Sequence, residues 1–250
     1  MEKIKSYRKY LRRNKNLLVL PKHNMKKIIL DLCGGTGSWS LPYKETGYDV
    51  KVITVPEYDI LYTTYENELL NFRDGKDMGV CLIVNPKEVY GILAAPPCTM
   101  FSFVRTTPKR SRDLVNSVNL VYKCLEIIWF CQRQLVNQHQ KLPPLKFWAL
   151  ENPYFGMLNW YLGKPAFIFQ PYEFGDGYKK KTALWGKFNE PIKQEKWIMK
   201  NNKKFDSLLM EEIKALKSPI NEEAGNPKTR KTLRAITPRG FALAFYKANK

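Results

Sequence analysis

The chain has 250 residues and a mass of 29.3 kDa, and its 44% hydrophobic and 26% charged content is typical of a folded globular protein rather than a disordered one. No uninterrupted run of about 18 apolar residues occurs and the amino terminus lacks the apolar core of a secretory signal, so we expect a soluble intracellular protein with no membrane partner. The five cysteines form no CxxC pair and are accompanied by two histidines, which excludes a zinc site and a disulfide framework from the expected features.

The positive charge of the chain is concentrated at its two ends. The formal net charge is +19, which makes nucleic acid the first partner to consider. Residues 1–27 carry 10 basic and 1 acidic residue, residues 179–250 carry 18 and 7, and the stretch between them sums to −1. This distribution favours a near-neutral catalytic core that is held on phosphate groups by basic extensions.

The pattern of apolar residues predicts an alternation of strands and helices, because short apolar runs indicate strands and helical spacing indicates helices. In chain order, the expected elements are a basic arm or helix over 3–20, strands at 27–33, 49–55 and 91–95, a helix over 113–138, strands at 146–150, 167–170 and 182–185, and a closing helix over 238–248. Alternating elements of this kind predict an α/β fold with a doubly wound, mostly parallel sheet and a site at the carboxyl ends of its strands.

The same pattern divides the chain into four parts. Residues 1–26 form a basic arm, 27–187 the core, 188–232 a small Lys-rich insertion without a clear strand, and 233–250 a carboxyl-terminal helix that completes the core.

A glycine cluster follows the first predicted strand, in the sequence Asp31-Leu-Cys-Gly-Gly-Thr-Gly37. Glycines let the backbone approach a ligand closely, and the amino terminus of a helix follows them. The lysine of a phosphate-binding loop is absent, and Thr54 stands where a dinucleotide site carries an acidic residue, with Glu57 only later. A plain tight turn is the structural alternative to a cofactor loop.

Two further motifs follow predicted strands. In Ala95-Pro96-Pro97-Cys98-Thr99 the prolines stiffen the backbone and hold one thiol in a fixed direction, so Cys98 is a candidate nucleophile. The other cysteines that lie within apolar runs, Cys81, Cys124 and Cys131, are better explained as core residues.

The third motif is Glu151-Asn152-Pro153, which places a carboxyl group and an amide at the same edge as Cys98. A helix N-cap at Asn152 is the structural alternative.

The order of these motifs, a glycine loop, Pro-Pro-Cys and Glu-Asn-Pro, resembles that of the DNA cytosine-C5 methyltransferases. The resemblance covers residues 27–185 and resumes at 234–245, and it implies a Rossmann-like methyltransferase fold with a small insertion. It also implies S-adenosylmethionine as cofactor, held by Asp31, Cys33, Gly34, Gly35, Thr36, Gly37 and Pro96.

The resemblance assigns a role to each reactive residue. Cys98 would add to carbon 6 of a cytosine flipped out of double-stranded DNA, Glu151 would supply a proton or hydrogen bond at ring nitrogen 3, and Asn152 would fix the loop. The DNA contacts implied in this way are Ser102, Arg105, Lys179, Lys180, Lys181 and Thr182.

The chain departs from the family in four places, one of which is Glu151-Asn152-Pro153 in place of the commoner Glu-Asn-Val. Cys33 stands where the family usually has a phenylalanine, and the segment 170–182 replaces the arginine-bearing motif in the manner of small phage-encoded members, so that Lys179 or Lys181 would take the place of an arginine near the base. About 45 residues, 188–232, replace the large recognition domain, which predicts short or relaxed sequence specificity.

The resemblance further implies a metal-free monomer in the cytoplasm of a bacterial or phage-infected cell, used in DNA modification or self-protection of the restriction-modification kind. Two alternatives stay open: an RNA cytosine-5 methyltransferase, and an inactive DNA-binding or anti-restriction relative. An amino-methylating enzyme is disfavoured because Ala95 precedes the two prolines and Cys98 follows them.

Overall fold

The computed structural model describes residues 27–76, 79–103, 111–133, 145–176, 178–193 and 236–250. The predicted arm 1–26, most of the insertion 188–232 and the predicted DNA contact Arg105 lie outside the described residues.

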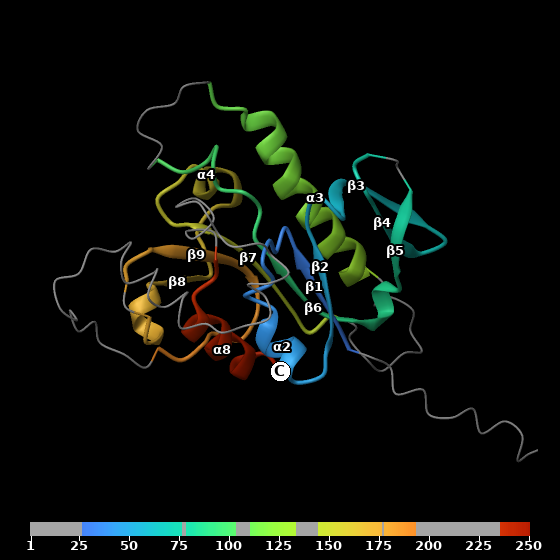
Figure 1. Cartoon of the computed structure of the whole chain (residues 1–250). Coiled ribbons are helices and arrows are strands. Elements are labelled where there is room, and N and C mark those ends of the chain that lie inside the picture. Colours follow the sequence, from blue (N-terminus) through green and yellow to red (C-terminus); the bar gives the residue numbers. More distant parts are fainter. Residues whose placement is uncertain (1–26, 77–78, 104–110, 134–144, 177, 194–235) are drawn as a thin grey trace, which may run out of the picture.

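The centre of the molecule is a mixed six-stranded sheet (Figure 1). Strands β1, β2, β6 and β7 are parallel to their neighbours in this group, whereas β9 runs antiparallel to both β7 and β8. The prediction of an α/β fold with a mostly parallel sheet is therefore confirmed, and the arrangement is compatible with a Rossmann-like fold. The strands, in their order across the sheet, are β2 (Asp49–Ile53), β1 (Ile28–Leu32), β6 (Val89–Ala94), β7 (Phe147–Pro153), β9 (Thr182–Lys187) and β8 (Phe167–Phe169).

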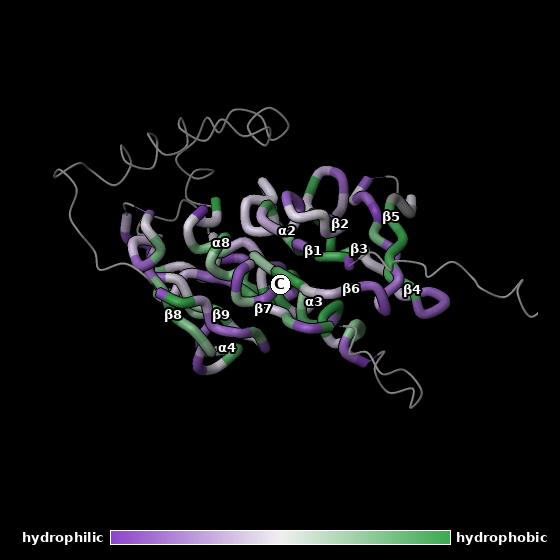
Figure 2. Tube along the Cα trace, turned by 90° about the horizontal axis from the view of Figure 1, so that it is seen from below, coloured by the Kyte–Doolittle hydropathy of each residue, from purple (hydrophilic) through white to green (hydrophobic). Residues whose placement is uncertain are grey.

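The central strand β1 is buried at all five positions because helices cover both faces of the sheet. Its side chains alternate between the two faces: Leu30 and Leu32 belong to the apolar cluster on one side, and Ile29 belongs to the cluster on the other. Figure 2 shows the helices α2 and α8 on one side of the strands and α3 and α4 on the other.

One face is covered by α3 (Leu114–Arg133), together with the short helix α4 (Leu158–Leu162). Among the described residues α3 is the one helix that is long and apolar enough to cross a membrane by length and composition, and Val121, Cys124 and Ile127 on one of its sides are buried in the core. The last residues of the predicted helix, 134–138, lie outside the described residues.

The other face is covered by α8 (Arg239–Ala248) and α2 (Leu41–Glu45). The closing helix predicted over 238–248 is confirmed. Its ring of Phe241 stacks on Phe169 of β8 with centroids 3.8 Å apart, and Phe245 meets the edge of Trp39 at 5.5 Å. These fully buried rings fix the carboxyl-terminal helix to the sheet.

A second, three-stranded antiparallel sheet was not predicted. It contains β3 (Asp59–Glu66), β4 (Leu69–Arg73) and β5 (Val80–Val84), and it lies beside α3 (Figure 1). A two-residue turn joins β3 to β4, with Asn67 and Glu68 both at positive φ, 52° and 61°. The short helical turns η2 (Pro86–Glu88) and η4 (Pro171–Phe174) complete the described elements.

The strand order determines where a ligand can bind. After β1 the chain first adds β2 on one side and later adds β6 on the other side. In open α/β sheets a crevice forms at such a switch point, outside the carboxyl ends of the two diverging strands. Here those ends carry the glycine loop after β1 and the Pro-Pro-Cys loop after β6.

Candidate active site

The loop that carries Cys98 leaves β6 as a continuation of the sheet. The backbone N–H of Ala95 still bonds to the carbonyl of Leu32, 2.9 Å away, and Pro96 is buried. The chain then turns, because the N–H groups of Phe101 and Ser102 both donate to the Cys98 carbonyl, at 3.0 and 2.9 Å. Cys98 is partly exposed at the start of this turn, as a nucleophile must be.

The guanidinium group of Arg112 fixes the far side of the turn. It donates hydrogen bonds to the carbonyls of Met100 and Ser102. Cys124 and Cys131, by contrast, are fully buried in α3, which confirms the prediction that they are core residues.

Glu151 and Asn152 lie within β7 rather than after it. They pair in antiparallel register with Leu184 and Ala183 of β9. Asn152 therefore caps no helix, and the alternative explanation of this residue as an N-cap is wrong.

The amide of Asn152 connects the two segments that carry the candidate residues Cys98 and Glu151. Its Nδ2 donates to the carbonyl oxygen of Pro96 at 2.9 Å, and the Asn152 side chain is 1% exposed. This bond joins the strand that carries Glu151 to the loop that carries Cys98. Since the Pro96 carbonyl is away from water, the bond holds the loop at a fixed distance from β7.

A lysine neighbours the carboxyl group of Glu151. The Nζ of Lys180 is 3.7 Å from Glu151 Oε1, and the two side chains are 20% and 15% exposed. The ammonium group of Lys181 instead lies 4.0 Å above the ring of Tyr154, and Lys179 is exposed. Lys180, rather than Lys179 or Lys181, is thus the cation beside the predicted base-binding carboxyl group.

Two of the residues predicted to contact DNA, Thr182 and Ser102, make contacts within the protein. Thr182 is 1% exposed and its hydroxyl donates to the Lys180 carbonyl at 2.8 Å, so it holds Lys180 in place and presents no surface to DNA. Ser102 is partly buried and forms an isolated bridge with Gly156. Ser102 therefore connects the Cys98 turn to the segment that follows β7.

The glycine loop has the backbone conformation that its sequence requires. Gly35 and Gly37 have φ values of 56° and 68°, which residues other than glycine rarely adopt. A Cβ at Gly34 would overlap the carboxyl group of Asp31, whereas a Cβ at Gly35 would meet no atom within 4 Å. The loop is therefore packed tightly on its inner side and open on its outer side at Gly35.

Asp31 lies beneath this loop and is fully buried. Ser40 Oγ donates to its Oδ2 at 2.5 Å, while Oδ1 is buried without a hydrogen-bond partner. Burial raises the pKa of Asp31 to about 6, and the hydrogen bond from Ser40 opposes that rise. Asp31 therefore shapes the loop from below and does not stand in the crevice itself.

Cys33 also turns toward the core. It has a left-handed backbone, with φ at 57°, and its partly buried side chain packs against the cluster under α3. A hydrogen bond with the Cys33 thiol, together with burial, raises the pKa of Cys124 well above its usual range. Cys33 therefore offers a ligand its backbone more than its side chain.

The tail and the glycine loop are in contact. Thr36 Oγ1 donates to Ser38 Oγ at 3.2 Å, and the same Ser38 oxygen accepts from the backbone N–H of Thr237 at 3.0 Å. This contact places the segment before α8 at the loop, although 199 residues separate the two partners.

Glu57 is not among the predicted site residues, but its position suits a cofactor. It is exposed just beyond the carboxyl end of β2, in a turn closed by the Tyr58 N–H and the Thr54 carbonyl at 2.9 Å. It comes 20 residues after Gly37, the separation at which Rossmann-like folds carry an acidic residue for ribose hydroxyls. In the sequence, Glu57 is set aside because the position is counted from the end of the strand rather than from the loop.

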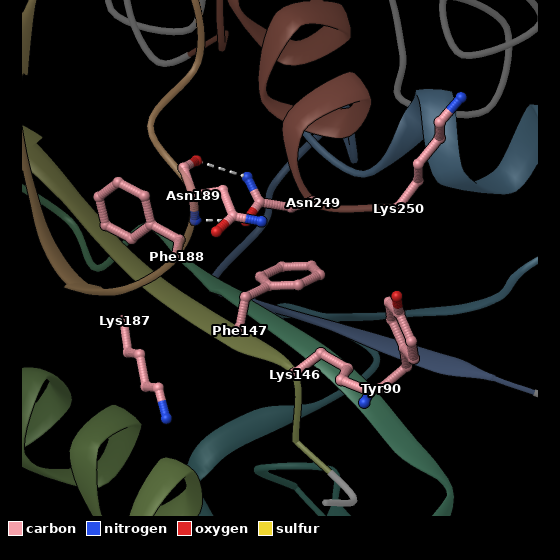
Figure 3. A pocket seen from close by; sticks show the side chains of 8 residues that line it. All are labelled: Tyr90, Lys146, Phe147, Lys187, Phe188, Asn189, Asn249 and Lys250. Carbon is pink, nitrogen blue, oxygen red and sulfur yellow. Dashed lines mark hydrogen bonds between the residues drawn. The ribbon is translucent and has the colours of Figure 1, made fainter.

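A pocket of about 350 Å³ opens at the opposite end of the sheet (Figure 3). It lies beside the first residues of β6 and β7, whereas Cys98 and Glu151 lie at the carboxyl ends of these strands. Asn189 and Asn249 close one side of it through mutual hydrogen bonds. Its lining is Tyr90, Lys146, Phe147, Lys187, Phe188, Asn189, Asn249 and Lys250. This pocket is therefore separate from the candidate active site.

Within the described residues, no group of three or more His, Cys, Asp or Glu side chains lies close enough to hold a metal ion. No protein-family model matches the chain, and no curated protein matches it either. The function is accordingly argued from the geometry of the site.

Proposed function

We propose that this protein transfers a methyl group from S-adenosylmethionine to carbon 5 of cytosine in DNA, with Cys98 as the nucleophile. The observation that carries the proposal is the hydrogen bond from Asn152 to the Pro96 carbonyl. It fixes a partly exposed thiol and a partly buried carboxyl group at the carboxyl ends of two adjacent parallel strands. These are the two groups that chemistry at cytosine carbon 5 requires.

Carbon 5 of cytosine is a poor nucleophile until the ring is activated. Addition of the Cys98 thiolate to carbon 6 breaks the 5,6 double bond and moves its electron pair toward carbon 5 and the ring. Glu151 stabilises that charge by donating a proton or hydrogen bond to ring nitrogen 3. After methyl transfer, a solvent base removes the carbon 5 proton, the electron pair of that C–H bond restores the 5,6 double bond, and the bond between carbon 6 and sulfur breaks to release Cys98 as thiolate. The proton given to ring nitrogen 3 returns to Glu151.

Lys180 supports the same step. Its ammonium group beside Glu151 can donate to the base, in place of the arginine that the resembling family has near the base. A cation there also offsets the negative charge that the thiolate pushes into the ring. Thr182 supports this placement through its hydrogen bond to the Lys180 carbonyl.

The residues at the switch point fit the cofactor, which when bound supplies an electrophilic methyl group on a sulfonium. The open backbone at Gly35 and the exposed Glu57 carboxylate can hold its amino acid and ribose parts. The unpartnered Oδ1 of Asp31 lies directly under Gly34 and attracts a cationic group held above the loop.

The test is methyl transfer from isotopically labelled S-adenosylmethionine to unmethylated DNA, followed by identification of the nucleosides by mass spectrometry. Label is expected in 5-methylcytosine with the wild type and with Cys131→Ser, which changes a buried cysteine of α3. It is expected to vanish with Cys98→Ser. Label in RNA alone, or the same activity in Cys98→Ser, would overturn the proposal, and binding of DNA without transfer would identify an inactive relative.

The sequence specificity can be measured with the same material. Methylation sequencing of treated DNA is expected to show a short or relaxed target, because about 45 residues replace the large recognition domain. A strict target of six or more bases would contradict this expectation.

A further inference from the structure

Exposed aromatic side chains gather beside the Cys98 turn. Seven aromatic side chains are exposed in the described part of the chain, and four of them come from the two segments that flank this turn. They are 47% to 72% exposed, which is unusual for large apolar groups in one place. We call these four residues, Phe103, Phe155, Trp160 and Tyr161, the aromatic rim.

Backbone hydrogen bonds attach the aromatic rim to the active-site loop. The N–H of Phe103 donates to the Phe155 carbonyl at 3.3 Å, and the N–H of Met157 donates to the Phe101 carbonyl at 3.0 Å. Phe101 itself closes the turn onto Cys98. The aromatic rim is therefore connected to the Cys98 turn by backbone hydrogen bonds.

The rings also contact one another while keeping free surface. The centroids of Phe103 and Trp160 are 5.7 Å apart with an angle of 54° between the planes, so the two rings do not cover each other's faces. Trp160 is 72% exposed, and the ring centroid of Tyr161 lies 6.2 Å from that of Phe101. Flat aromatic surface is thus available to a partner.

One lysine borders these rings, and a second lies next to it in the sequence. The ammonium group of Lys181 is 5.4 Å from the ring of Phe155, and the neighbouring Lys180 contacts Glu151. A surface that combines open aromatic rings with lysines matches the bases and phosphates of a nucleic acid strand.

We propose that the aromatic rim stacks on unpaired bases next to the target cytosine, so that single-stranded or locally melted DNA is the preferred substrate. This inference rests on the proposed function and differs from the duplex expected from the family resemblance. In a duplex both faces of each base are already covered by neighbouring bases, and rings on a protein surface have nothing to stack on. An unpaired cytosine also needs no extraction from a stack before reaction.

The experiment measures binding of a fluorescently labelled oligonucleotide that contains one cytosine, as a single strand and as a duplex, without cofactor. The single strand is expected to bind more tightly than the duplex at physiological salt. Trp160→Ala is expected to weaken single-strand binding by about tenfold, the scale of one base–aromatic stack. Trp160→Phe keeps a stacking ring and is expected to retain most of the affinity, and Phe103→Ala should weaken binding in the same direction.

Trp129→Ala is the matched control. Trp129 is a tryptophan with 57% exposure on α3, where its ring meets Arg133 rather than the Cys98 turn. Its replacement should leave the affinity unchanged, and circular dichroism of each variant confirms that the fold is intact.

The results separate this inference from the methyltransferase proposal. Wild-type affinity in both Trp160→Ala and Phe103→Ala would overturn the stacking role, and so would tighter binding of the duplex or of an RNA of the same sequence. Because the binding assay needs no methyl transfer, a protein without transferase activity can still support the aromatic rim. Conversely, methylation confined to duplex DNA would support the transferase and refute the single-strand preference.

Discussion

Replacing Asn152 by alanine tests the central contact of the site. The change removes the donor of a 2.9 Å hydrogen bond and leaves the buried Pro96 carbonyl oxygen without that donor. Such an unsatisfied group costs about 1–3 kcal/mol of unfolding free energy. For a chain of this size each kcal/mol lowers the melting temperature by about 2–4 °C.

The same change should lower the turnover number more than stability alone explains. Without the bond the loop that carries Cys98 is no longer fixed to β7, and a displacement of about 1 Å at a reacting group can cost about 100-fold in rate. We therefore expect kcat in the methylation assay to fall by roughly 10- to 100-fold at a temperature where the variant is folded, with a smaller change in KM.

Asn249→Ala is the control for this experiment. Asn249 is also buried, and its amide donates to the carbonyls of Asn189 and Phe245 at the opposite end of the sheet. The Asn249→Ala variant should have a lower melting temperature than the wild type and the same kcat. If Asn152→Ala also kept the wild-type kcat while losing stability, the hydrogen bond would stabilise the fold without positioning Cys98. If it lost neither, the bond itself would be refuted.

Three further changes probe the surroundings of the site. Lys180→Gln removes the ammonium group 3.7 Å from Glu151 and should lower kcat/KM by roughly 10- to 100-fold in initial-rate assays, with recovery in Lys180→Arg. Asp31→Asn should flatten the pH dependence of the free energy of unfolding. Burial raises the pKa of Asp31 from 3.8 to about 6, so the folded state binds the proton more tightly than the unfolded state. The free energy of unfolding of the wild type should therefore fall by about 3 kcal/mol relative to this variant as the pH rises from about 4 to above 6. Gly240→Ala places a Cβ against the carbonyl oxygen of Phe174, a backbone atom that cannot rotate away, and should destabilise the protein by about 1–3 kcal/mol in thermal unfolding.

Each of these changes has a comparison that decides its interpretation. Lys187→Gln changes an exposed lysine at the other end of β9, beside the separate pocket, and should keep the wild-type rate. Parallel melting curves for wild type and Asp31→Asn across pH 4 to 8 would contradict the raised pKa of that carboxyl group. Leu243→Ala, on the exposed side of α8, should leave the melting temperature close to that of the wild type. If Leu243→Ala lowered the melting temperature as much as Gly240→Ala does, the loss in Gly240→Ala could not be assigned to the overlap with Phe174.

The parallel core of the sheet could be predicted because its strands are buried on both faces. Continuous apolar runs ending in glycine or proline identified β1 and β6 to within two residues at each end. The sheet of β3, β4 and β5 was not predicted, because exposed and buried positions do not alternate regularly along β3. Its hairpin turn is Asn67-Glu68 rather than the Asn-Gly or Asp-Gly pair that marks such turns, although both residues have the positive φ that the turn requires.

The motifs of the candidate site could be found in the sequence, but their partners could not. Three consecutive lysines precede β9, and only the path of the loop decides that Lys180 reaches Glu151 while Lys181 lies on Tyr154. The aromatic rim is a similar case, because Phe103 and Trp160 are 57 residues apart and meet only through the pairing of two loops. Exposure of an apolar side chain is a property of the folded surface, on which local sequence gives no information.

The strand geometry of β7 explains how two adjacent residues acquire opposite roles. Successive side chains of a strand point to opposite faces, and here Ala149 joins the cluster under α8 while Leu150 joins the cluster under α3. Continued by two residues, the same alternation separates Glu151 from Asn152. One side chain is buried against the Pro96 carbonyl and the other meets Lys180 with part of its surface open. Because pairing with β9 extends through both positions, one set of backbone bonds fixes the Glu151 carboxyl group and the Asn152 amide that holds the Cys98 loop. A shift of one residue in that register would exchange the two side chains and remove both contacts together, and with them the geometry on which the proposed function depends.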